Sequence, residues 1–512
     1  MDGRKRRKSG NSIIRGIFVG LSFLLQVGWI LLLILKLNRY SAYISLLSSV
    51  IAVIVVLRLY SRPNNSAYKM PWILLILCLP VMGLSLFLLT EVSLTPKSAL
   101  RKLRQIRKDN SSYLIQQPEI LGRLEGENPA AASQCRYLWQ QDGDPVYRNT
   151  AVQYYPQATD AFTAMKEALE QAESFIFMEY FIIEDGASFD SIREILARKA
   201  SQGVEVRLMY DDVGSIGTVN LRYARELNKQ GIRCQVFNPA LPFLNLFLNN
   251  RDHRKITVID GKVAFTGGFN LADEYFGITK PYGHWKDTGI RLEGEAVRSL
   301  TATFLELWNV ASRTQEDPSK YLNIQHSVPA EGYVQPFGEN PLDEEPVAEN
   351  VLLNMLGNAK KYIWFLTPYL IITDELNRAM TLAAKRGVDV RIITPGIPDK
   401  KTVYALTRSY YSGLAAQGVR IFEYSPGFCH GKQCLCDGET ACIGTSNLDY
   451  RSLYLHFENN VLLHRCDAVT KMEQDFRETF GLCREVTEQY RSGRGKMMRF
   501  WQCVLRLFAP MM

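Results

Sequence analysis

The chain has 512 residues, and its 60 lysines and arginines against 52 aspartates and glutamates leave a formal net charge of +8. This length and charge exclude a small single domain, an acidic disordered tail and a histone-like protein. Hydrophobic residues make up 47% and charged residues 22%, but the apolar residues are concentrated near the N-terminus.

Three apolar runs occupy the first ninety residues. Residues 16–35 form a run of twenty without a formal charge, and runs of seventeen and twenty-one follow at 41–57 and 70–90. Each approaches the roughly 20 residues with which a helix crosses a bilayer. The sequence therefore predicts a membrane anchor at 1–91 with up to three spans. A buried core helix is the alternative reading, and the absence of a small-residue cleavage site argues against a signal peptide.

The orientation of this anchor follows from the charges on its two flanks. Three full spans would place the two flanks on opposite faces of the membrane, yet equal numbers of basic residues leave the topology open. Residues 92–108 are expected to form a basic helical neck. The six basic residues before the first run and the six after the third are Arg4, Lys5, Arg6, Arg7, Lys8, Arg15, Lys97, Arg101, Lys102, Arg104, Arg107 and Lys108.

An internal repeat organises the chain beyond the neck. A helical pattern at 160–173 leads into the apolar run 174–183, and 349–360 leads likewise into 361–372. The segments 203–208 and 231–237 are then matched by 387–392 and 418–424. Helices that alternate with strands indicate an α/β fold, here two similar lobes that form one pseudo-twofold body.

The repeat also sets the expected domain boundaries. The first lobe is predicted at 109–313, a polar, proline-bearing linker at 314–346, the second lobe at 347–490 and a basic amphipathic tail at 491–512. Because each lobe would contribute one wall of a shared site, neither lobe is expected to work alone.

The third block of the repeat carries the motif H-x-K-x4-D in both halves. Side chains alternate along a strand, so a histidine and a lysine two residues apart project from the same face, whereas the aspartate has the opposite parity and is expected to support the fold. A turn of small residues then returns an asparagine to the pair. The motif residues are His253, Lys255, Asp260 and Asn270 in the first half, and His430, Lys432, Asp437 and Asn447 in the second.

Such a pair of motifs suits a phosphodiester substrate. The lysines and the asparagines Asn270 and Asn447 would donate hydrogen bonds to phosphate oxygens. One neutral histidine would attack phosphorus while the other, protonated, would hand a proton to the leaving alcohol, and the second step would reverse these roles. This chemistry requires no metal and no cofactor. A lone histidine on a strand is usually structural, but the full motif at equivalent positions favours catalysis.

The chain resembles the phospholipase D superfamily, and within it the bacterial cardiolipin synthase branch. The resemblance covers nearly the whole chain and includes the N-terminal segment 67–83, Glu179-Tyr-Phe, His284-Trp-Lys-Asp287-Thr, Thr367-Pro-Tyr and the segment 444–452. It implies a phospholipase D-like α/β fold and an exchange in which two phosphatidylglycerol molecules give cardiolipin and glycerol through a phosphohistidine.

The same resemblance implies residue roles. His253 is the expected nucleophile, and His430 is the expected general acid and then base. The acidic residues Asp287 and Glu458, each on a strand after a motif, would orient the histidines and fix their tautomers.

The expected partners are phosphatidylglycerol and anionic membrane lipid, and no nucleic acid, because the lobes lack a basic stripe interleaved with aromatic residues. A hydrolytic phospholipase D, in which water resolves the intermediate, is the nearest alternative function, and a membrane-tethered nuclease is a more distant one.

Two further segments are expected to contact lipid. The first half carries ten additional residues within 239–252, rich in leucine and phenylalanine, which either pack on their own lobe or enter the membrane interface. The tail interleaves basic with apolar residues, which suits a helix on anionic lipid; a nucleic-acid patch is the competing interpretation.

The ten cysteines are irregularly spaced, which is unlike the framework of a small secreted domain. We interpret them as reduced thiols, which places the catalytic lobes on the cytoplasmic side of a cell membrane that the anchor crosses more than once. Cys429, Cys434, Cys436 and Cys442 surround His430, but no C-x2-C pair supports a zinc site and apolar packing is favoured. Cys434 and Cys436 share strand parity with His430, so thiol sensitivity is a secondary hypothesis.

Overall fold

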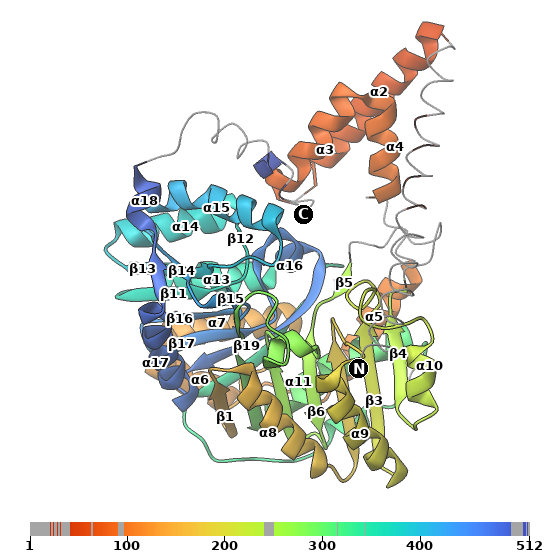
Figure 1. Ribbon diagram of the computed structural model, residues 1–512, viewed down its shortest axis with the longest axis vertical. Helices are drawn as coiled ribbons and strands as arrows, with labels where there is room; N and C mark the ends of the chain where they lie inside the picture. Colours follow the sequence, from red (N-terminus) through yellow and green to blue (C-terminus); the bar gives the residue numbers. More distant parts are fainter. Residues whose placement is uncertain are drawn as a thin grey trace.

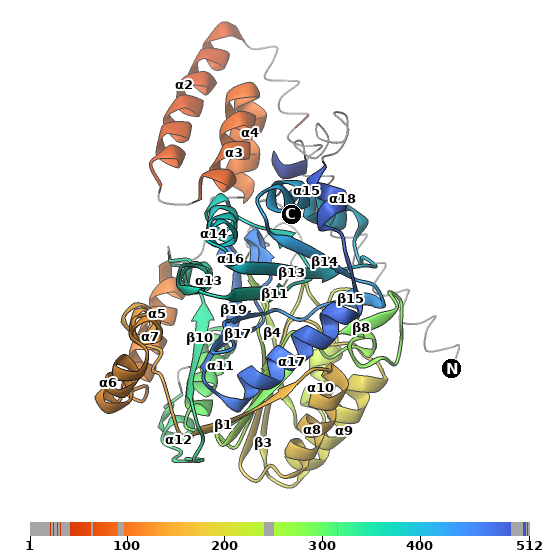
Figure 2. The same cartoon turned by 90° about the vertical axis from the view of Figure 1, so that its left-hand side faces the viewer.

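The computed structural model describes residues 41–62, 65–90, 97–239, 250–314, 316–343, 345–492, 505–507 and 509, with isolated positions between 21 and 31. Two α/β lobes lie against each other, and a group of helices from the N-terminal part stands apart from both (Figures 1 and 2).

The first lobe is built on a seven-stranded sheet in the order β1-β9-β7-β6-β2-β3-β4. Strands β2, β3 and β4 run parallel, and the remaining pairs are antiparallel. The central strand β2 is buried along its whole length, as its apolar sequence requires when helices cover both faces of the sheet. The strands are β1 (Thr150–Tyr155), β2 (Phe175–Tyr180), β3 (Glu205–Asp211), β4 (Arg233–Phe237), β6 (Lys255–Ile259), β7 (Val263–Gly267) and β9 (Gly289–Gly294).

The second lobe repeats this topology, which confirms the internal repeat of the sequence. Its strands follow the order β10-β19-β17-β16-β11-β13-β14-β20, so each strand from β10 to β14 has a counterpart in the first sheet. They are β10 (Tyr333–Glu339), β11 (Tyr362–Leu366), β13 (Asp389–Pro395), β14 (Arg420–Tyr424), β16 (Gln433–Cys436), β17 (Thr440–Gly444), β19 (His456–His464) and β20 (Cys483–Glu485).

Helices fill the space between the sheets and cover their outer faces. Two equivalent helices, α11 (Val297–Ala311) and α17 (Asp467–Gly481), belong to the shared core between the lobes. Each reaches across to the other lobe, because α11 packs on β10 and α17 packs on β1. The outer faces are covered by α8 (Ala158–Glu170) and α9 (Ala187–Ser201) in the first lobe, and by α13 (Val347–Asn358) and α14 (Asp374–Lys385) in the second.

Further helices and strands complete the two lobes. They are η1 (Asp273–Phe276), α10 (Tyr223–Asn228), α12 (Ser319–Leu322), α15 (Lys401–Ala416), α16 (Tyr450–Tyr454) and α18 (Thr487–Arg491), with the paired strands β12 (Leu370–Ile371) and β18 (Leu448–Asp449).

Two short pairs of parallel strands connect the lobes. Strand β5 (Arg251–Asp252) of the first lobe pairs with the start of β19, and β15 (Gly427–Cys429) of the second lobe pairs with β8 (His284–Lys286). Both β5 and β15 directly precede a motif histidine. The pseudo-twofold arrangement therefore anchors each histidine to the opposite lobe.

The N-terminal helices differ from the sequence prediction at one point. The run 41–57 lies within α2 (Ser41–Tyr60), but the run 70–90 is not one helix, because it breaks at Pro80 into α3 (Ser66–Cys78) and α4 (Pro80–Thr90). The two pack closely at Gly83, where a Cβ would lie 2.6 Å from the Cα of Ile76. Within the described parts of the chain, none of the helices combines the length and apolarity that crossing a bilayer requires. Most of the first run lies outside the described residues.

The predicted neck belongs to the folded body. Helix α5 (Lys97–Ser111) packs on α11, and the Arg107 guanidinium lies 3.2 Å from Glu306 and 3.3 Å from Asp142. Helices α6 (Pro118–Glu127) and α7 (Pro129–Asp142), assigned to the first lobe by sequence, bury their apolar faces in the core of the second. The predicted linker at 314–346 contains β10, whose seven residues are all buried. The glutamine, proline, glycine and glutamate within its sequence Tyr-Val-Gln-Pro-Phe-Gly-Glu masked the strand in the sequence.

Only a few tail residues are described, and they contact the second lobe. Arg506 donates to the carbonyl of Ser409 at 2.5 Å, and its guanidinium lies 4.2 Å from the ring centroid of Tyr410. This part of the predicted lipid-binding tail therefore packs on α15. The predicted lipid-contacting segment of 239–252 lies largely outside the described residues.

Candidate active site

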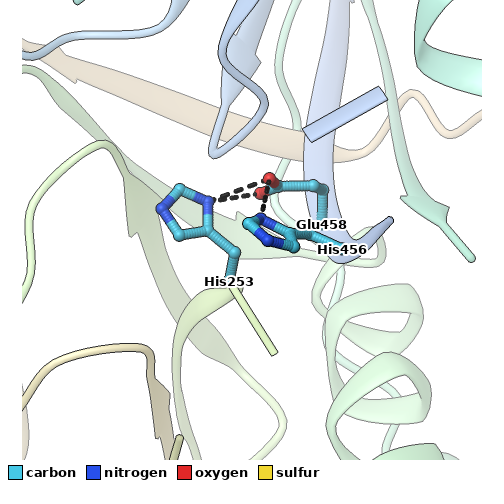
Figure 3. Close-up of side chains that lie close together, drawn as sticks. All are labelled: His253, His456 and Glu458. Atoms are coloured by element: carbon cyan, nitrogen blue, oxygen red, sulfur yellow. Dashed lines mark hydrogen bonds and ion pairs between the residues drawn. The ribbon is translucent and has the colours of Figure 1, made fainter. Parts of the chain in front are cut away.

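His253 of the first motif is held by the second lobe. Its backbone N–H donates to the carbonyl of Phe457 at 2.9 Å, and its Nδ1 lies 2.8 Å and 2.9 Å from the two carboxylate oxygens of Glu458 (Figure 3). Just before it, Arg251 forms a buried ion pair with Asp211 on β3, with Nη2 2.7 Å from Oδ1. These contacts fix the ring and direct Nε2 away from the carboxylate.

His430 of the second motif is held in the same way by the first lobe. Its backbone N–H donates to the carbonyl of Lys286 at 2.7 Å, and its Nδ1 lies 2.7 Å from Oδ2 of Asp287. Each carboxylate that follows one motif in sequence therefore pairs with the histidine of the other motif. The sequence identified both acids but not this exchange between lobes.

The surroundings of the two carboxylates differ. The Thr445 hydroxyl donates to Glu458 at 2.5 Å. At the equivalent position of the first lobe, a Cβ on Gly268 would lie 2.1 Å from Oδ1 of Asp287. Glycine at this position therefore makes room for the shorter acid, whereas threonine supplies a hydrogen bond to the longer one.

The two motif lysines complete the cluster. Lys255 Nζ donates to the carbonyl of His253 at 2.5 Å, and Lys432 Nζ donates to the carbonyl of His430 and lies 3.0 Å from its Nε2. Burial lowers the pKa of Lys255 to about 7 and that of Lys432 to about 8. Each lysine also lowers the pKa of its own histidine. Two ammonium groups this close to two imidazoles create a site that favours an anion.

Both motif histidines favour the neutral form. Burial lowers the pKa of His253 well below its usual value, and the charge of Lys255 adds to this effect. Burial, followed by Lys432, lowers the pKa of His430 to about 4, although Asp287 acts in the opposite direction. Neutral imidazoles held at Nδ1 present Nε2 for reaction, which is what a nucleophile or a general base requires.

The two asparagines differ in the hydrogen bonds that they make. Asn270 accepts from the N–H of Ile182 at 3.1 Å and donates to the Tyr275 hydroxyl at 2.8 Å. Asn447 is buried, and its Oδ1 has no hydrogen-bond partner among the described residues. Their binding of substrate phosphate stays a prediction.

The motif aspartates lie where their strand parity predicts, and they bind backbone. Asp260 accepts hydrogen bonds of 2.7–2.8 Å from three successive N–H groups at residues 173–175, and Asp437 accepts the equivalent three at residues 360–362. Both aspartates adopt positive φ, at 53° and 54°. They cap the entry to β2 and β11 and make no contact with the histidines.

We expect Asp260→Ala to lower the free energy of unfolding by about 2–4 kcal/mol, because three N–H groups lose a charged acceptor. The change should appear as a lower midpoint of thermal unfolding, with the KM for the substrate unchanged in the folded fraction. A large loss of kcat at unchanged thermal stability would show instead that Asp260 acts in the reaction.

The described cysteines are all free thiols. Cys434 Sγ lies 3.5 Å from Met355 Sδ and Cys436 Sγ lies 3.8 Å from the Met355 carbonyl, so both thiols pack against α13 on the outer side of the sheet. These contacts agree with apolar packing, the interpretation that the sequence favoured, and the secondary hypothesis of thiol sensitivity stays a prediction.

One residue beside the site was missed by the sequence analysis. His456 lies two residues before Glu458 on β19 and therefore shares its face, and its ring centroid is 5.6 Å from that of His253 (Figure 3). The spacing to Glu458 was a usable signal, but the acid itself was recognised only through the family resemblance. Trp285 holds the equivalent position beside Asp287, and its ring lies 5.5 Å from that of His430.

Comparison with known families gives two matches. The family model described as cardiolipin synthase, PLD-like domain, matches residues 165–308 and 352–480, and the model described as phospholipase D-nuclease N-terminal matches residues 48–90. The first match covers more than half of the chain and includes both motifs.

Similar curated proteins cover most of the chain. A cardiolipin synthase of Geobacillus kaustophilus is 34% identical over 91% of this chain and 92% of its own length, and one of Halalkalibacterium halodurans is 32% identical over 91% and 93%. An uncharacterized protein of Streptococcus mutans is 40% identical over 89% and 99%.

A solved structure shares the fold. The phosphatidylserine synthase of Haemophilus influenzae superposes with a TM-score of 0.54 at 15% identity, over 70% of this chain and 93% of its own.

Proposed function

The chain belongs to the cardiolipin synthase family of phospholipase D-like proteins, and we propose that it transfers a phosphatidyl group from one phosphatidylglycerol to another through a phosphohistidine, with release of glycerol. The observation that carries this proposal is the pair of histidines, each held at Nδ1 by a carboxylate of the opposite lobe, with two buried lysines beside them.

In the first step, Nε2 of His253 attacks phosphorus and the P–O bond to the glycerol headgroup breaks. His430, protonated in the complex, gives its proton to the departing glycerol oxygen. The negative charge of the bound substrate favours the protonated form of His430, and Asp287 stabilises this imidazolium. The lysines neutralise charge on the phosphate oxygens, which is largest in the transition state.

In the second step, the hydroxyl of another phosphatidylglycerol attacks the phosphohistidine. Neutral His430 takes the proton of that hydroxyl, the P–N bond breaks and His253 leaves with its electron pair restored. Cardiolipin is the product, and the enzyme returns to its starting protonation state. Because one phosphodiester is exchanged for another, the phosphohistidine intermediate conserves the free energy of the P–O bond that is broken.

We further propose that the protein is a multi-pass protein of the cell membrane with its lobes on the cytoplasmic side. The apolar N-terminal runs and the matched N-terminal family model support membrane association. Helix α2 also exposes large apolar side chains, which suits contact with lipid. They include Leu46, Leu47, Ile54 and Leu57, with exposed fractions of 59–65%.

Incubation of the full-length protein in membranes with labelled phosphatidylglycerol, without added metal or nucleotide, tests the proposed reaction. We expect labelled cardiolipin and an equal amount of released glycerol. Phosphatidic acid as the only product would assign the protein to the hydrolases, and cleavage of DNA without lipid turnover would overturn the lipid substrate altogether.

The lysines predict a pH dependence of substrate binding. Their ordinary pKa is near 10.5, and burial lowers it to about 7 for Lys255 and about 8 for Lys432, so both ammonium groups lose protons as the pH rises from 7 to 9. The apparent KM for phosphatidylglycerol should therefore rise at least about tenfold over this range. The measurement uses vesicles of constant anionic lipid content, and a flat KM would contradict the role of the lysines.

A further inference from the structure

The pseudo-twofold symmetry of the site is also broken two residues before each orienting carboxylate. His456 on β19 and Trp285 on β8 each lie two residues before the carboxylate that orients a motif histidine. The ring of Trp285 faces His430, whereas the ring of His456 faces His253. At this position, the side of the site around His253 therefore gains an imidazole with a lone pair, whereas the side around His430 has an indole without one.

This additional imidazole is buried and lacks hydrogen bonds. His456 is 8% exposed, and neither of its ring nitrogens has a hydrogen-bond partner among the described residues. Its Nδ1 lies 3.9 Å from Oε1 of Glu458, which is too long for a hydrogen bond. A buried polar group without a partner is unfavourable, so an unpaired imidazole aimed at a carboxylate indicates a place for a ligand.

Three possible metal ligands converge at this place. His253, His456 and Glu458 each offer one nitrogen or oxygen atom, and these atoms all lie within 4.8 Å of one another (Figure 3). Two imidazoles and one carboxylate suit Zn²⁺, which binds such sets of three with a fourth position left for water. Mg²⁺ and Ca²⁺ prefer oxygen ligands and fit this set poorly.

We propose that His253, His456 and Glu458 form an inhibitory site for Zn²⁺. This inference rests on the proposed function, because it assigns a regulatory ligand to the same site. A zinc ion between Glu458 and His253 takes the lone pair of Nδ1, so the proton of that neutral ring moves to Nε2. The nitrogen that would attack phosphorus then carries a proton and has no lone pair. Zinc bound at Nδ1 thus prevents the attack of His253 on phosphorus.

The charge of the surroundings sets how tightly the ion binds. Lys255, Arg251 and Arg451 act on His456 as positive neighbours and oppose a cation. Burial raises the pKa of Glu458 to about 8, so a metal ion must also displace the proton of this carboxyl group. The site therefore suits a strongly coordinating ion such as Zn²⁺ rather than a cation held by charge alone.

The test compares wild type, His456→Asn and the control His326→Asn, which removes a partly exposed histidine outside the cluster. Zinc binding to the purified full-length protein is measured by equilibrium dialysis with Zn²⁺ alone, and inhibition by Zn²⁺ is measured as cardiolipin formed from labelled phosphatidylglycerol. We expect wild type and H326N to bind one zinc ion at least tenfold more tightly than H456N, and the half-inhibitory concentration of zinc to rise at least tenfold in H456N.

Several outcomes of these measurements decide whether the zinc site exists. Equal zinc binding by wild type and H456N would overturn the site, as would equal inhibition of the two. If no variant forms cardiolipin but the difference in zinc binding remains, the site stands and the proposed function fails. His456→Gln provides the same comparison in case the asparagine variant does not fold, and replacement of zinc by Mg²⁺ should remove both effects.

Discussion

Replacement of His253 by asparagine is expected to abolish cardiolipin synthesis, with a fall in kcat of about 10³-fold or more. Asparagine keeps a polar group of similar reach that can still contact Glu458, so the fold and the carboxylate should be preserved. Asparagine cannot form a stable bond to phosphorus, and among the described residues no other buried imidazole lies within hydrogen-bond distance of Glu458 through its Nδ1.

The measurement is the rate of cardiolipin formation in membranes with equal amounts of each variant. The thermal unfolding midpoint serves as a check that H253N is folded, and His326→Asn serves as a control for histidine removal in general. Turnover by folded H253N within tenfold of wild type would show that His253 is not the nucleophile.

A large fall in kcat is also expected for Asp287→Asn, because Asp287 pairs with the histidine of the opposite lobe. His430 loses the carboxylate that fixes its tautomer and stabilises its imidazolium. We expect kcat to fall about 10²-fold or more, in the range known for groups that orient a catalytic or metal-bound histidine. Because Asp287 raises the pKa of His430, its loss should also shift the basic limb of the kcat profile to lower pH.

Two comparisons separate this positioning role from a structural one. The double variant Asp287→Asn with His430→Asn should be no slower than His430→Asn alone, because both changes disable the same group. Glu293→Gln removes a partly exposed carboxylate on β9 and should leave kcat unchanged. Independent, multiplicative losses in the double variant would contradict the pairing of Asp287 with His430.

Much of this arrangement could be predicted from the sequence because the repeat is strong. The motifs pointed to the histidines and the lysines as candidate site residues. Strand alternation alone predicted that Asp260 lies on the opposite face of its strand, away from the site. The two lobes and their α/β class followed from matching apolar runs. These inferences depend on local periodicity, which a sequence displays directly.

Contacts between the lobes were harder to predict. Nothing in the spacing of Asp287 shows that it pairs with His430 rather than with His253, because that choice depends on how β8 and β15 meet between lobes. Likewise, the apolar run at 70–90 does not reveal that Pro80 begins a new helix packed against the one before it. His456 was missed because its significance lies in a neighbour more than two hundred residues away.

The most direct test of the shared site is to trap the covalent intermediate. The His430→Asn variant lacks both the general acid of the first step and the general base of the second. With a phosphodiester lipid whose leaving group is nitrophenol, the first step still proceeds, because nitrophenolate leaves without protonation. The second step then stalls, because no base removes the proton of the incoming hydroxyl. Rapid quenching and peptide mapping should then find the phosphatidyl group on His253, with nitrophenol released in one equivalent. A label on any other residue, or full turnover without a covalent intermediate, would contradict the account.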